Sequence, residues 1–262
     1  MSDRPALRAA VVGASAGLGR SIGIGLAKKG SRVAFLARRH DRLVRAMDEA
    51  GNGAIAVTCD VTDAAASQRA VAEVVEEFGG LDALVYTTGM GVLAPLADVT
   101  SEQWAQLFAT NVTGASLITA AAAPHLAESA GSAVYLSSLS ASYTTPWPFL
   151  GSYAVTKGAL DKLVEAWRVE HPNIGFTRLA VGDSLGGTGD SQTEFSSGWD
   201  PDALEKAIRF WMENKYMLGG LIDVEHLVEV VDNVIRCGSS AFIPYITLAP
   251  RASDAVKELR QW

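Results

Sequence analysis

Seven short apolar runs alternate with helix-like stretches along almost the whole chain, and this alternation constrains the fold more than any other feature of the sequence. Strands that alternate with helices at this spacing form a parallel, doubly wound sheet, with right-handed crossovers and helices on both faces. We therefore expect an α/β fold in which residues 1–262 form a single domain. The expected strands cover residues 9–12, 32–37, 55–58, 81–86, 132–136, 174–181 and 241–248.

The composition supports a large folded core and excludes several classes of protein. Of the 262 residues, 48% are hydrophobic and 19% are charged, which excludes a disordered chain. The net charge of −7 argues against a nucleic-acid-binding surface. Cys59 and Cys237 lie far apart, without the spacing of a metal site or a disulfide framework. This cysteine usage favours buried thiols in a reducing cytoplasm.

Two stretches bear on localisation. The first residues, Met1 to Arg8, have no long apolar core after a basic start, so we expect no signal peptide. Residues 103–127 carry no formally charged side chain and are long enough to span a bilayer. They also contain many amides and hydroxyls, with few large aliphatic side chains, so insertion would be costly. We expect this stretch to be a buried helix of a cytoplasmic protein without a membrane partner.

A glycine-rich turn follows the first expected strand. The segment Gly13-Ala-Ser15-Ala-Gly17-Leu18-Gly19 separates this strand from a helical pattern with apolar residues at four-residue intervals. A strand, a glycine turn and a helix in this order aim backbone N–H groups at a phosphate. A glycine cluster alone is often only a tight turn, and it is the flanking strand and helix that favour a phosphate site.

Other residues of interest come directly after the remaining strands. Arg38 follows the second strand, Asp60 the third, Gly89 the fourth and Ser138 the fifth. Ligands of doubly wound sheets bind outside the carboxyl ends of the strands. We therefore expect these four residues to meet the glycine turn at one edge of the sheet.

Tyr153 and Lys157 lie four residues apart in an expected helix that runs to about residue 167. On a helix this spacing places both side chains on one face. A neighbouring ammonium stabilises a phenolate, so the pair is expected to lower the pKa of Tyr153 and to exchange a proton with an alcohol or a carbonyl. Many helices carry this pair only as a half-buried tyrosine beside a solvated lysine, and its significance here comes from the strand ends around it.

Gly-x-x-x-Gly-x-Gly after the first strand, with Tyr-x-x-x-Lys in the second half, resembles the short-chain dehydrogenase/reductase family over about residues 7–248. The resemblance implies a Rossmann fold and an NAD(P)-dependent oxidoreductase, with no metal ion. It assigns the acid/base role to Tyr153 and the polarisation of the substrate oxygen to Ser138. Lys157 would lower the tyrosine pKa and bind the nicotinamide ribose, and Asn111 would place a water of a proton relay. The cofactor-binding residues that it implies are Gly13, Ser15, Gly17, Leu18, Gly19, Arg38, Asp60, Val61, Gly89, Tyr153 and Lys157.

Two serines compete for the serine role. Ser138 lies fifteen residues before Tyr153, whereas Ser140 has the family's commoner spacing of thirteen. The flanking Leu-Ser-Ser-Leu-Ser pattern and a slightly long loop at residues 144–150 favour Ser138, and Ser140 stays open as the alternative.

Three positions depart from the family pattern. Val12 replaces the threonine that usually precedes the first glycine, and residues 86–89 replace the usual Asn-Asn-Ala-Gly. We interpret these two changes as a local repacking of neighbouring strands, in which Gly89 still lets the cofactor approach. Val181-Gly182 replaces the usual Pro-Gly after the sixth strand, which bears on nicotinamide binding but not on the fold.

The residue after the second strand indicates which nicotinamide cofactor is used. An aspartate there would hold the ribose hydroxyls and repel a 2′-phosphate. This chain has Arg38 followed by Arg39, which favours NADP(H) over NAD(H). Ala16 stands at the family's other basic position, which indicates a modest preference.

Residues 183–220 are expected to form a substrate lid, because a Gly-, Ser- and Thr-rich stretch there precedes a short helix at 202–212. Large apolar residues cluster around it without a fixed cation, which suggests a pocket for a hydrophobic alcohol or ketone, such as a steroid-like or terpenoid compound. The candidate pocket residues are Met90, Trp147, Phe149, Phe195, Trp199, Trp211, Tyr216 and Met217.

The leading hypothesis is an NADP(H)-dependent oxidoreductase that interconverts a hydrophobic secondary alcohol and its ketone. A non-catalytic nicotinamide-binding sensor or scaffold on the same fold is an alternative, as is an epimerase or dehydratase with a tightly held cofactor. The resemblance also implies a homo-oligomer, a tetramer or a dimer, formed through the helices that carry Asn111 and Tyr153.

Overall fold

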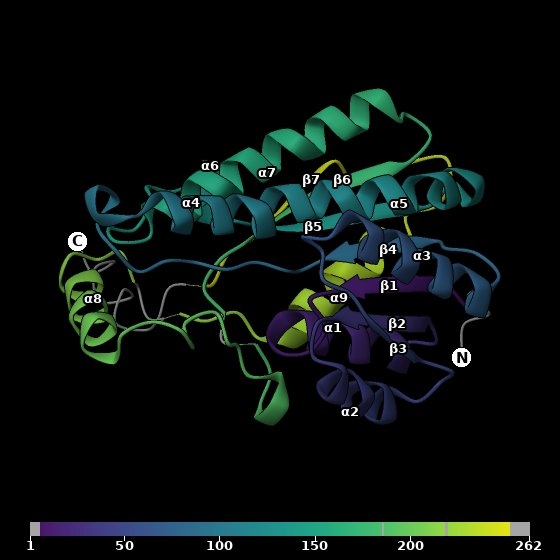
Figure 1. Ribbon diagram of the computed structural model, residues 1–262, viewed down its shortest axis with the longest axis horizontal. Coiled ribbons are helices and arrows are strands. Elements are labelled where there is room, and N and C mark those ends of the chain that lie inside the picture. The colour runs from purple at the N-terminus through teal and green to yellow at the C-terminus, as the bar shows by residue number, and fades with distance from the viewer. Residues whose placement is uncertain (1–5, 185, 218–219, 252–262) are drawn as a thin grey trace, which may run out of the picture.

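The computed structural model describes residues 6–184, 186–217 and 220–251. Within these ranges seven parallel strands form one sheet in the order β3-β2-β1-β4-β5-β6-β7 (Figure 1). The expected parallel, doubly wound sheet is therefore confirmed. The strands are β1 (Arg8–Val12), β2 (Arg32–Ala37), β3 (Ile55–Thr58), β4 (Ala83–Tyr86), β5 (Ser132–Ser138), β6 (Gly175–Val181) and β7 (Tyr245–Leu248).

Helices cover both faces of the sheet (Figure 1). Two short 3₁₀ turns, η1 (Leu96–Asp98) and η3 (Gly189–Ser191), lie in the connections, and a π-helical turn, η2 (Ala109–Thr113), joins two helices. The α-helices are α1 (Gly17–Lys28), α2 (His40–Ala50), α3 (Ala64–Phe78), α4 (Ser101–Phe108), α5 (Gly114–Ser129), α6 (Leu139–Ser142), α7 (Gly151–Glu170), α8 (Pro201–Glu213) and α9 (Val224–Ile235).

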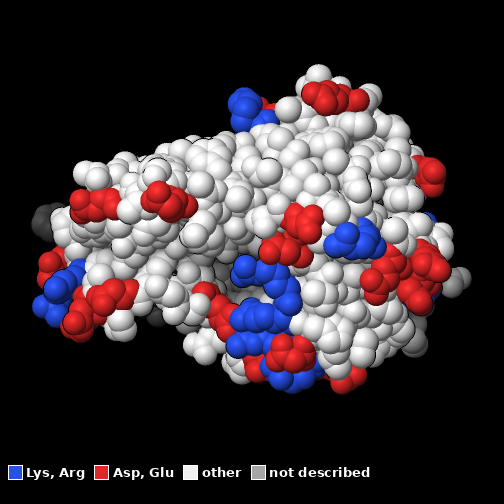
Figure 2. All heavy atoms as spheres, viewed as in Figure 1, with Lys and Arg blue, Asp and Glu red and all other residues white. Residues whose placement is uncertain are grey.

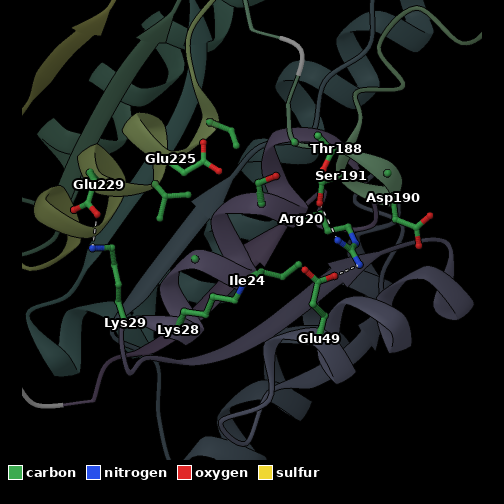
Figure 3. Close-up of a pocket in the computed structure, with 16 residues that line it drawn as sticks. Arg20, Ile24, Lys28, Lys29, Glu49, Thr188, Asp190, Ser191, Glu225 and Glu229 are labelled. Carbon is green, nitrogen blue, oxygen red and sulfur yellow. Dashed lines mark hydrogen bonds and ion pairs between the residues drawn. The ribbon is translucent and has the colours of Figure 1, made fainter.

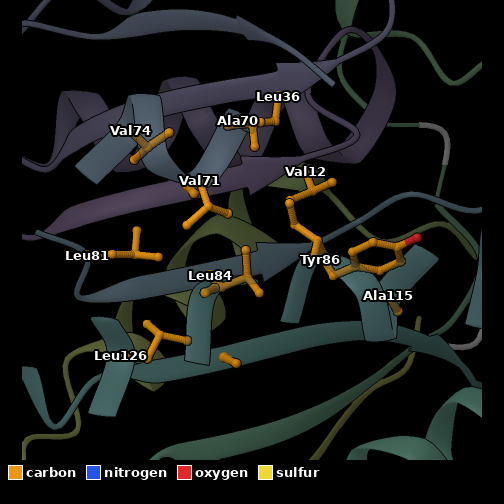
Figure 4. Packing of buried hydrophobic residues seen from close by; sticks show 14 of the residues in the cluster. Val12, Leu36, Ala70, Val71, Val74, Leu81, Leu84, Tyr86, Ala115 and Leu126 are labelled. Carbon is orange, nitrogen blue, oxygen red and sulfur yellow. The ribbon is translucent and has the colours of Figure 1, made fainter. Parts of the chain in front are cut away.

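Alternation along each strand divides the core into two layers. In β1, Ala10 and Val12 belong to the layer beneath α3, α5 and α7, whereas Ala9 and Val11 belong to the layer beneath α1, α2 and α9. Figure 4 shows the first layer, in which Val71 and Val74 of α3 face strand residues such as Leu84. Because both faces of the parallel sheet are buried, the strands appear in the sequence as continuous apolar runs.

Local sequence explains where the elements begin and end. The side chain of Asp63 caps α3 by accepting hydrogen bonds from the Ala65 and Ala66 N–H groups, and Gly79 ends this helix in the left-handed conformation. The expected seventh strand is shortened from its start at residue 241 to Tyr245, directly after Pro244, which has no N–H to donate to the sheet.

The uncharged stretch at residues 103–127 is not one regular helix. It spans α4, the π-helical turn η2 and α5, which together cover residues 101–129. The extra residue of a π-turn shifts the side-chain register of a helix, and such turns are frequent at functional sites. Asn111 lies in the middle of this turn.

Candidate active site

A cleft of about 1910 Å³ opens at the carboxyl ends of the strands. It has room for a dinucleotide together with a small substrate, because ligand pockets are usually about 300–1,000 Å³. Figure 2 shows Lys and Arg side chains gathered around a hollow in the lower half of the molecule. The cleft is lined by all eleven expected cofactor residues: Gly13, Ser15, Gly17, Leu18, Gly19, Arg38, Asp60, Val61, Gly89, Tyr153 and Lys157.

The glycine turn is built for close contact between backbones. Gly13 has a φ of 88°, in the region that favours glycine. A Cβ atom at Gly19 would lie 2.3 Å from the Thr87 Oγ1 atom and 2.5 Å from the Gly13 carbonyl oxygen. Neither position therefore accepts a larger residue without a shift of its neighbours.

The turn also fits a phosphate group. Helix α1 begins at Gly17, and its N-cap residue, Ala16, supplies no side-chain hydrogen bond to the first N–H groups. These N–H groups and the positive end of the helix dipole are therefore left for an anion in the cleft. The residues present fit the pyrophosphate of a dinucleotide.

A hydroxyl directly after β4 contacts the backbone at position 12, where the family usually has a residue other than valine before the first glycine. The Thr87 Oγ1 atom donates a hydrogen bond of 2.7 Å to the Val12 carbonyl oxygen, and the Thr87 N–H donates to the same oxygen. The Thr87 hydroxyl and N–H thus link the end of β1 to the residue that follows β4. Gly89 lies close to Lys157, since a Cβ atom at Gly89 would be 3.3 Å from the Lys157 Nζ atom.

Ser138 and Tyr153 both line the cleft. Burial raises the pKa of Tyr153 to about 12, and the nearby Ser138 hydroxyl acts in the opposite direction. Ser140 lies one step further away, with its hydroxyl 2.9 Å from the Ser138 hydroxyl. The geometry therefore favours Ser138 as the serine next to the phenol.

The arrangement of Tyr153 and Lys157 differs from the expectation in one respect. The Lys157 Nζ atom lies 5.7 Å from the centre of the Tyr153 ring and donates a hydrogen bond of 2.7 Å to the Leu136 carbonyl oxygen. The expected lowering of the Tyr153 pKa is wrong for this arrangement, because burial of the phenol raises that pKa. Burial also lowers the pKa of Lys157 to about 8, against the attraction of Asp161.

Asn111 joins three parts of the site. Its Oδ1 atom accepts a hydrogen bond of 2.8 Å from the Met90 N–H, and its Nδ2 atom donates to the Met90 carbonyl oxygen at 2.9 Å. The Nδ2 atom also donates to the Thr156 hydroxyl at 2.8 Å. The fully buried amide thus ties the π-helical turn to the loop after β4 and to α7. Sequence patterns gave no sign of the Thr156 contact.

The arginines after β2 divide into two groups. Arg38 lines the cleft, and no hydrogen bond joins it to any residue in the described ranges. Arg39 donates to the Ser15 hydroxyl at 2.8 Å, and together with Arg42 it forms ion pairs with Glu194. Arg42 and Glu194 were not foreseen, although Arg42 lies three residues after Arg39 at the start of α2, a helical spacing that could have indicated it.

Most of the expected pocket residues line one end of the cleft. Met90, Trp147, Trp199 and Trp211 do so, as do Phe195, Tyr216 and Met217. Phe149 is not among the lining residues and packs against Phe210 instead, with ring centres 5.8 Å apart. Phe195 packs edge-on against Tyr153 with ring centres 4.9 Å apart, a contact that was not predicted from the sequence.

One acidic group lies near the apolar lining. Asp183 follows Val181-Gly182 and lines the cleft, and burial raises its pKa to about 6. The expected apolar pocket therefore contains a half-buried carboxylate, which was not predicted from the sequence.

Comparisons with known proteins identify the family. The chain matches the sequence profile of the family described as short chain dehydrogenase over residues 8–182. An uncharacterized oxidoreductase of Methylorubrum extorquens is 38% identical over 159 residues, which are 59% of this chain and 63% of that protein. The 11-beta-hydroxysteroid dehydrogenase-like 3 of Arabidopsis thaliana is 34% identical over 178 residues, 66% of this chain and 57% of that protein. The matched stretches thus span less than two thirds of these relatives.

Solved structures share the fold over nearly the whole chain. A putative short-chain alcohol dehydrogenase from Sinorhizobium meliloti 1021 superposes with a TM-score of 0.78 at 25% identity, covering 94% of this chain and 95% of that one. Among the described residues, no helix is both long enough and apolar enough to cross a bilayer. The profile match, which extends from β1 to the end of β6, places the chain in the short-chain dehydrogenase/reductase family of NAD(P)-dependent oxidoreductases.

Proposed function

We propose that this protein is an NADP(H)-dependent oxidoreductase that interconverts a hydrophobic secondary alcohol and its ketone. The observation that carries the proposal is the meeting of Ser138, Tyr153 and Lys157 in the same cleft as the uncapped start of α1. One region of the cleft offers an anion site for the dinucleotide, and another offers a proton donor for a substrate oxygen.

Each catalytic side chain has a task that its surroundings support. With a pKa of about 12, Tyr153 is a neutral phenol at physiological pH and donates a proton to a carbonyl oxygen during reduction. In the reverse direction it accepts the proton of the alcohol. Ser138 holds the same substrate oxygen, and Lys157 supplies the nearby positive charge. The nicotinamide, when bound, supplies or accepts the hydride.

The preference for NADP(H) is part of this proposal. Arg38 and Arg39 follow β2 at the place where the adenosine ribose of a dinucleotide lies in this fold. The Ser15 hydroxyl adds a third polar group beside Arg39. Two guanidinium groups and a hydroxyl favour a phosphate over a free ribose hydroxyl.

The substrate class is proposed from the lining of the catalytic end. Met90, Trp147, Trp199 and Trp211 offer apolar surface, which suits an alicyclic alcohol or ketone. The similarity to a protein named 11-beta-hydroxysteroid dehydrogenase-like 3 supports a steroid-like or terpenoid substrate. A cytoplasmic location and residues 183–220 as a substrate lid belong to the same proposal; residues 185, 218 and 219 of that segment lie outside the described ranges.

A panel of alicyclic ketones and alcohols, followed by nicotinamide absorbance with NADPH and with NADH, tests the proposal. We expect faster turnover with NADPH, and we expect Arg38→Asp to shift the preference towards NADH. Binding of NADPH without turnover of any panel member would favour a sensor or scaffold. A wild-type preference for NADH that Arg38→Asp leaves unchanged would contradict the assignment of the cofactor.

A further inference from the structure

Glu194 lies where the anionic part of a cofactor would be expected. Its two carboxylate oxygens accept from different arginines, one from Arg39 at the start of α2 and the other from Arg42 in the first turn. Although its partial burial acts to raise the pKa of Glu194, the hydrogen bonds from both arginines hold that pKa below its ordinary value. Two guanidinium groups around one anion are a typical arrangement for binding phosphate.

The Arg39 guanidinium connects this ion-pair cluster to the glycine turn. Its second nitrogen donates to the Ser15 hydroxyl at 2.8 Å. Arg39, Glu194 and Ser15 all line the large cleft, whereas Arg42 does not. Glu194 is therefore held on the cleft side by Arg39 and on the outer side by Arg42.

The chain around Glu194 also covers the phosphate turn. A Cβ atom at Gly17 would lie 3.4 Å from the Thr193 Cα atom, so residue 193 passes directly over the start of α1. Two residues earlier, the Ser191 hydroxyl accepts a hydrogen bond of 2.8 Å from Arg20. Figure 3 shows this contact at the edge of a second cavity, where Arg20 lies between Ser191 and Glu49.

The same chain covers the catalytic tyrosine immediately after Glu194. Phe195 packs edge-on against Tyr153 at 4.9 Å. Trp199 packs against Phe195 at 5.1 Å, and its Nε1 atom donates a hydrogen bond of 2.9 Å to the Gly91 carbonyl oxygen. One continuous segment, residues 191–199, thus contacts the arginines of the ion-pair cluster, the glycine turn and the Tyr153 phenol.

We propose that Glu194 is a carboxylate latch that occupies the place of the 2′-phosphate of NADP(H) at Arg39. Binding of that phosphate displaces Glu194 and frees residues 191–199 from the cleft, whereas NAD(H), which lacks the phosphate, leaves the latch closed. The latch thereby links the identity of the cofactor to the uncovering of Tyr153. This inference rests on the NADP(H) preference proposed above.

The physical reason is competition between two anions for one cation. A carboxylate and a phosphate that share Arg39 would repel each other at close range, in a site only partly screened by water. The phosphate carries the greater charge and more acceptor oxygens, so it forms the stronger contacts with the guanidinium group. Each ion pair of Glu194 is partly exposed and correspondingly weak, which makes the latch reversible.

Two small ligands separate the phosphate from the rest of the cofactor. Adenosine 2′,5′-bisphosphate carries the 2′-phosphate without a nicotinamide, and adenosine 5′-monophosphate lacks the 2′-phosphate. Calorimetry gives their dissociation constants, and hydrogen exchange of peptides from residues 186–199 reports the state of the segment. We expect the bisphosphate, but not the monophosphate, to increase exchange in this segment of the wild-type protein.

Glu194→Gln removes the charge of the latch and keeps its shape. We expect this variant to bind the bisphosphate about five- to tenfold more tightly than wild type, with unchanged affinity for the monophosphate, because two exposed ion pairs no longer oppose binding. Its segment is expected to exchange rapidly even without a ligand. Asp190→Asn is the matched control. Asp190 lies directly before residues 191–199, pairs with Arg45 of α2 at 3.0 Å and does not line the cleft.

The outcomes distinguish the latch from the cofactor preference. If the bisphosphate binds more tightly than the monophosphate, and by the same ratio in wild type and in Glu194→Gln, the latch is overturned and the NADP(H) preference stands. If the bisphosphate binds no more tightly than the monophosphate in any variant, the 2′-phosphate site fails and the latch fails with it. If Asp190→Asn binds the bisphosphate as much more tightly as Glu194→Gln does, the gain comes from the loss of any negative charge nearby. That result would also overturn the latch.

Discussion

At the scale of single residues, the site depends on which hydroxyl faces Tyr153. Ser138 ends β5 and acts to lower the pKa of the phenol, whereas Ser140 is in the first turn of α6 and its hydroxyl contacts the Ser138 hydroxyl. A difference of two residues in sequence therefore separates a direct contact from an indirect one.

Alanine substitutions at the two serines test this difference. We expect Ser138→Ala to lower kcat by about 10²–10³-fold, because a hydrogen-bond donor to the reacting oxygen is lost. Ser140→Ala should cost less than about tenfold, since its hydroxyl acts only through Ser138. Steady-state kinetics of both variants with one ketone measures the effect, and a larger loss in Ser140→Ala would reverse the assignment.

The buried Lys157 is expected to make the free energy of unfolding depend on pH. Its pKa falls from 10.5 in the unfolded chain to about 8 in the fold because of burial, so between these values the unfolded chain holds more protons. The free energy of unfolding of the wild type therefore rises with pH across this window, by up to about 3 kcal/mol. Urea unfolding at about pH 8 and about pH 10 should show this gain relative to Lys157→Met. A difference between the two proteins that does not change with pH would contradict it.

At the scale of elements, the π-helical turn is the feature that positions the site. The turn holds Asn111 between the loop after β4 and α7, and its side-chain amide makes three hydrogen bonds in a fully buried position. Without the extra residue of the π-turn, the Asn111 side chain would be rotated by about 100° around the helix axis, since 3.6 residues make one turn.

Replacement of Asn111 tests this role through stability. Asn111→Ala leaves the Met90 N–H, the Met90 carbonyl and the Thr156 hydroxyl with a missing partner, so we expect the free energy of unfolding to fall by about 2–4 kcal/mol. Asn233→Ala is the control. The Asn233 amide donates an exposed hydrogen bond to the Glu229 carbonyl oxygen, and its loss should cost less than about 0.5 kcal/mol. Equal losses in both variants would refute the role of the buried amide.

Regular elements were predictable from sequence, whereas the contacts between distant segments were not. The limits of β2, β3 and α3 follow directly from apolar periodicity, Asp63 and Gly79. The π-turn was missed because one extra residue leaves hydrophobic spacing almost unchanged. Glu194 was missed because its partners lie about 150 residues earlier, and no local pattern reports an ion pair over that separation. The Tyr153 pKa is raised rather than lowered, because burial of the phenol depends on the tertiary fold and not on the spacing to Lys157.

At the scale of the whole molecule, one face is suited to association. Figure 2 shows few charged side chains over the upper region, where Figure 1 places α4, α5 and α7. Phe108 of α4 is 37% exposed, and Val155 and Val169 of α7 are 49% and 81% exposed. From these exposed apolar side chains we propose that a second copy of the chain binds through these helices.

Charge on this face should prevent the association. We expect light scattering to give an oligomer for wild type and a monomer for the double variant Val155→Asp and Val169→Asp, because the buried carboxylates would have no partners. Met212→Asp is the control, since Met212 is 61% exposed on α8 and lies outside this face. A wild-type monomer, or an unchanged oligomer in the double variant, would contradict the proposed interface.

The central claim is that the chain reduces and oxidises its substrate through Tyr153. The most direct test is the initial rate of NADPH consumption with the most active ketone of the panel, compared between wild type, Tyr153→Phe and Tyr143→Phe. Tyr143 is a matched tyrosine, 49% exposed and packed over Arg178. We predict that Tyr153→Phe loses at least about 10²-fold in rate, because the proton donor is removed while the ring is kept, and that Tyr143→Phe retains the wild-type rate. A wild-type rate in Tyr153→Phe would contradict the proposed mechanism.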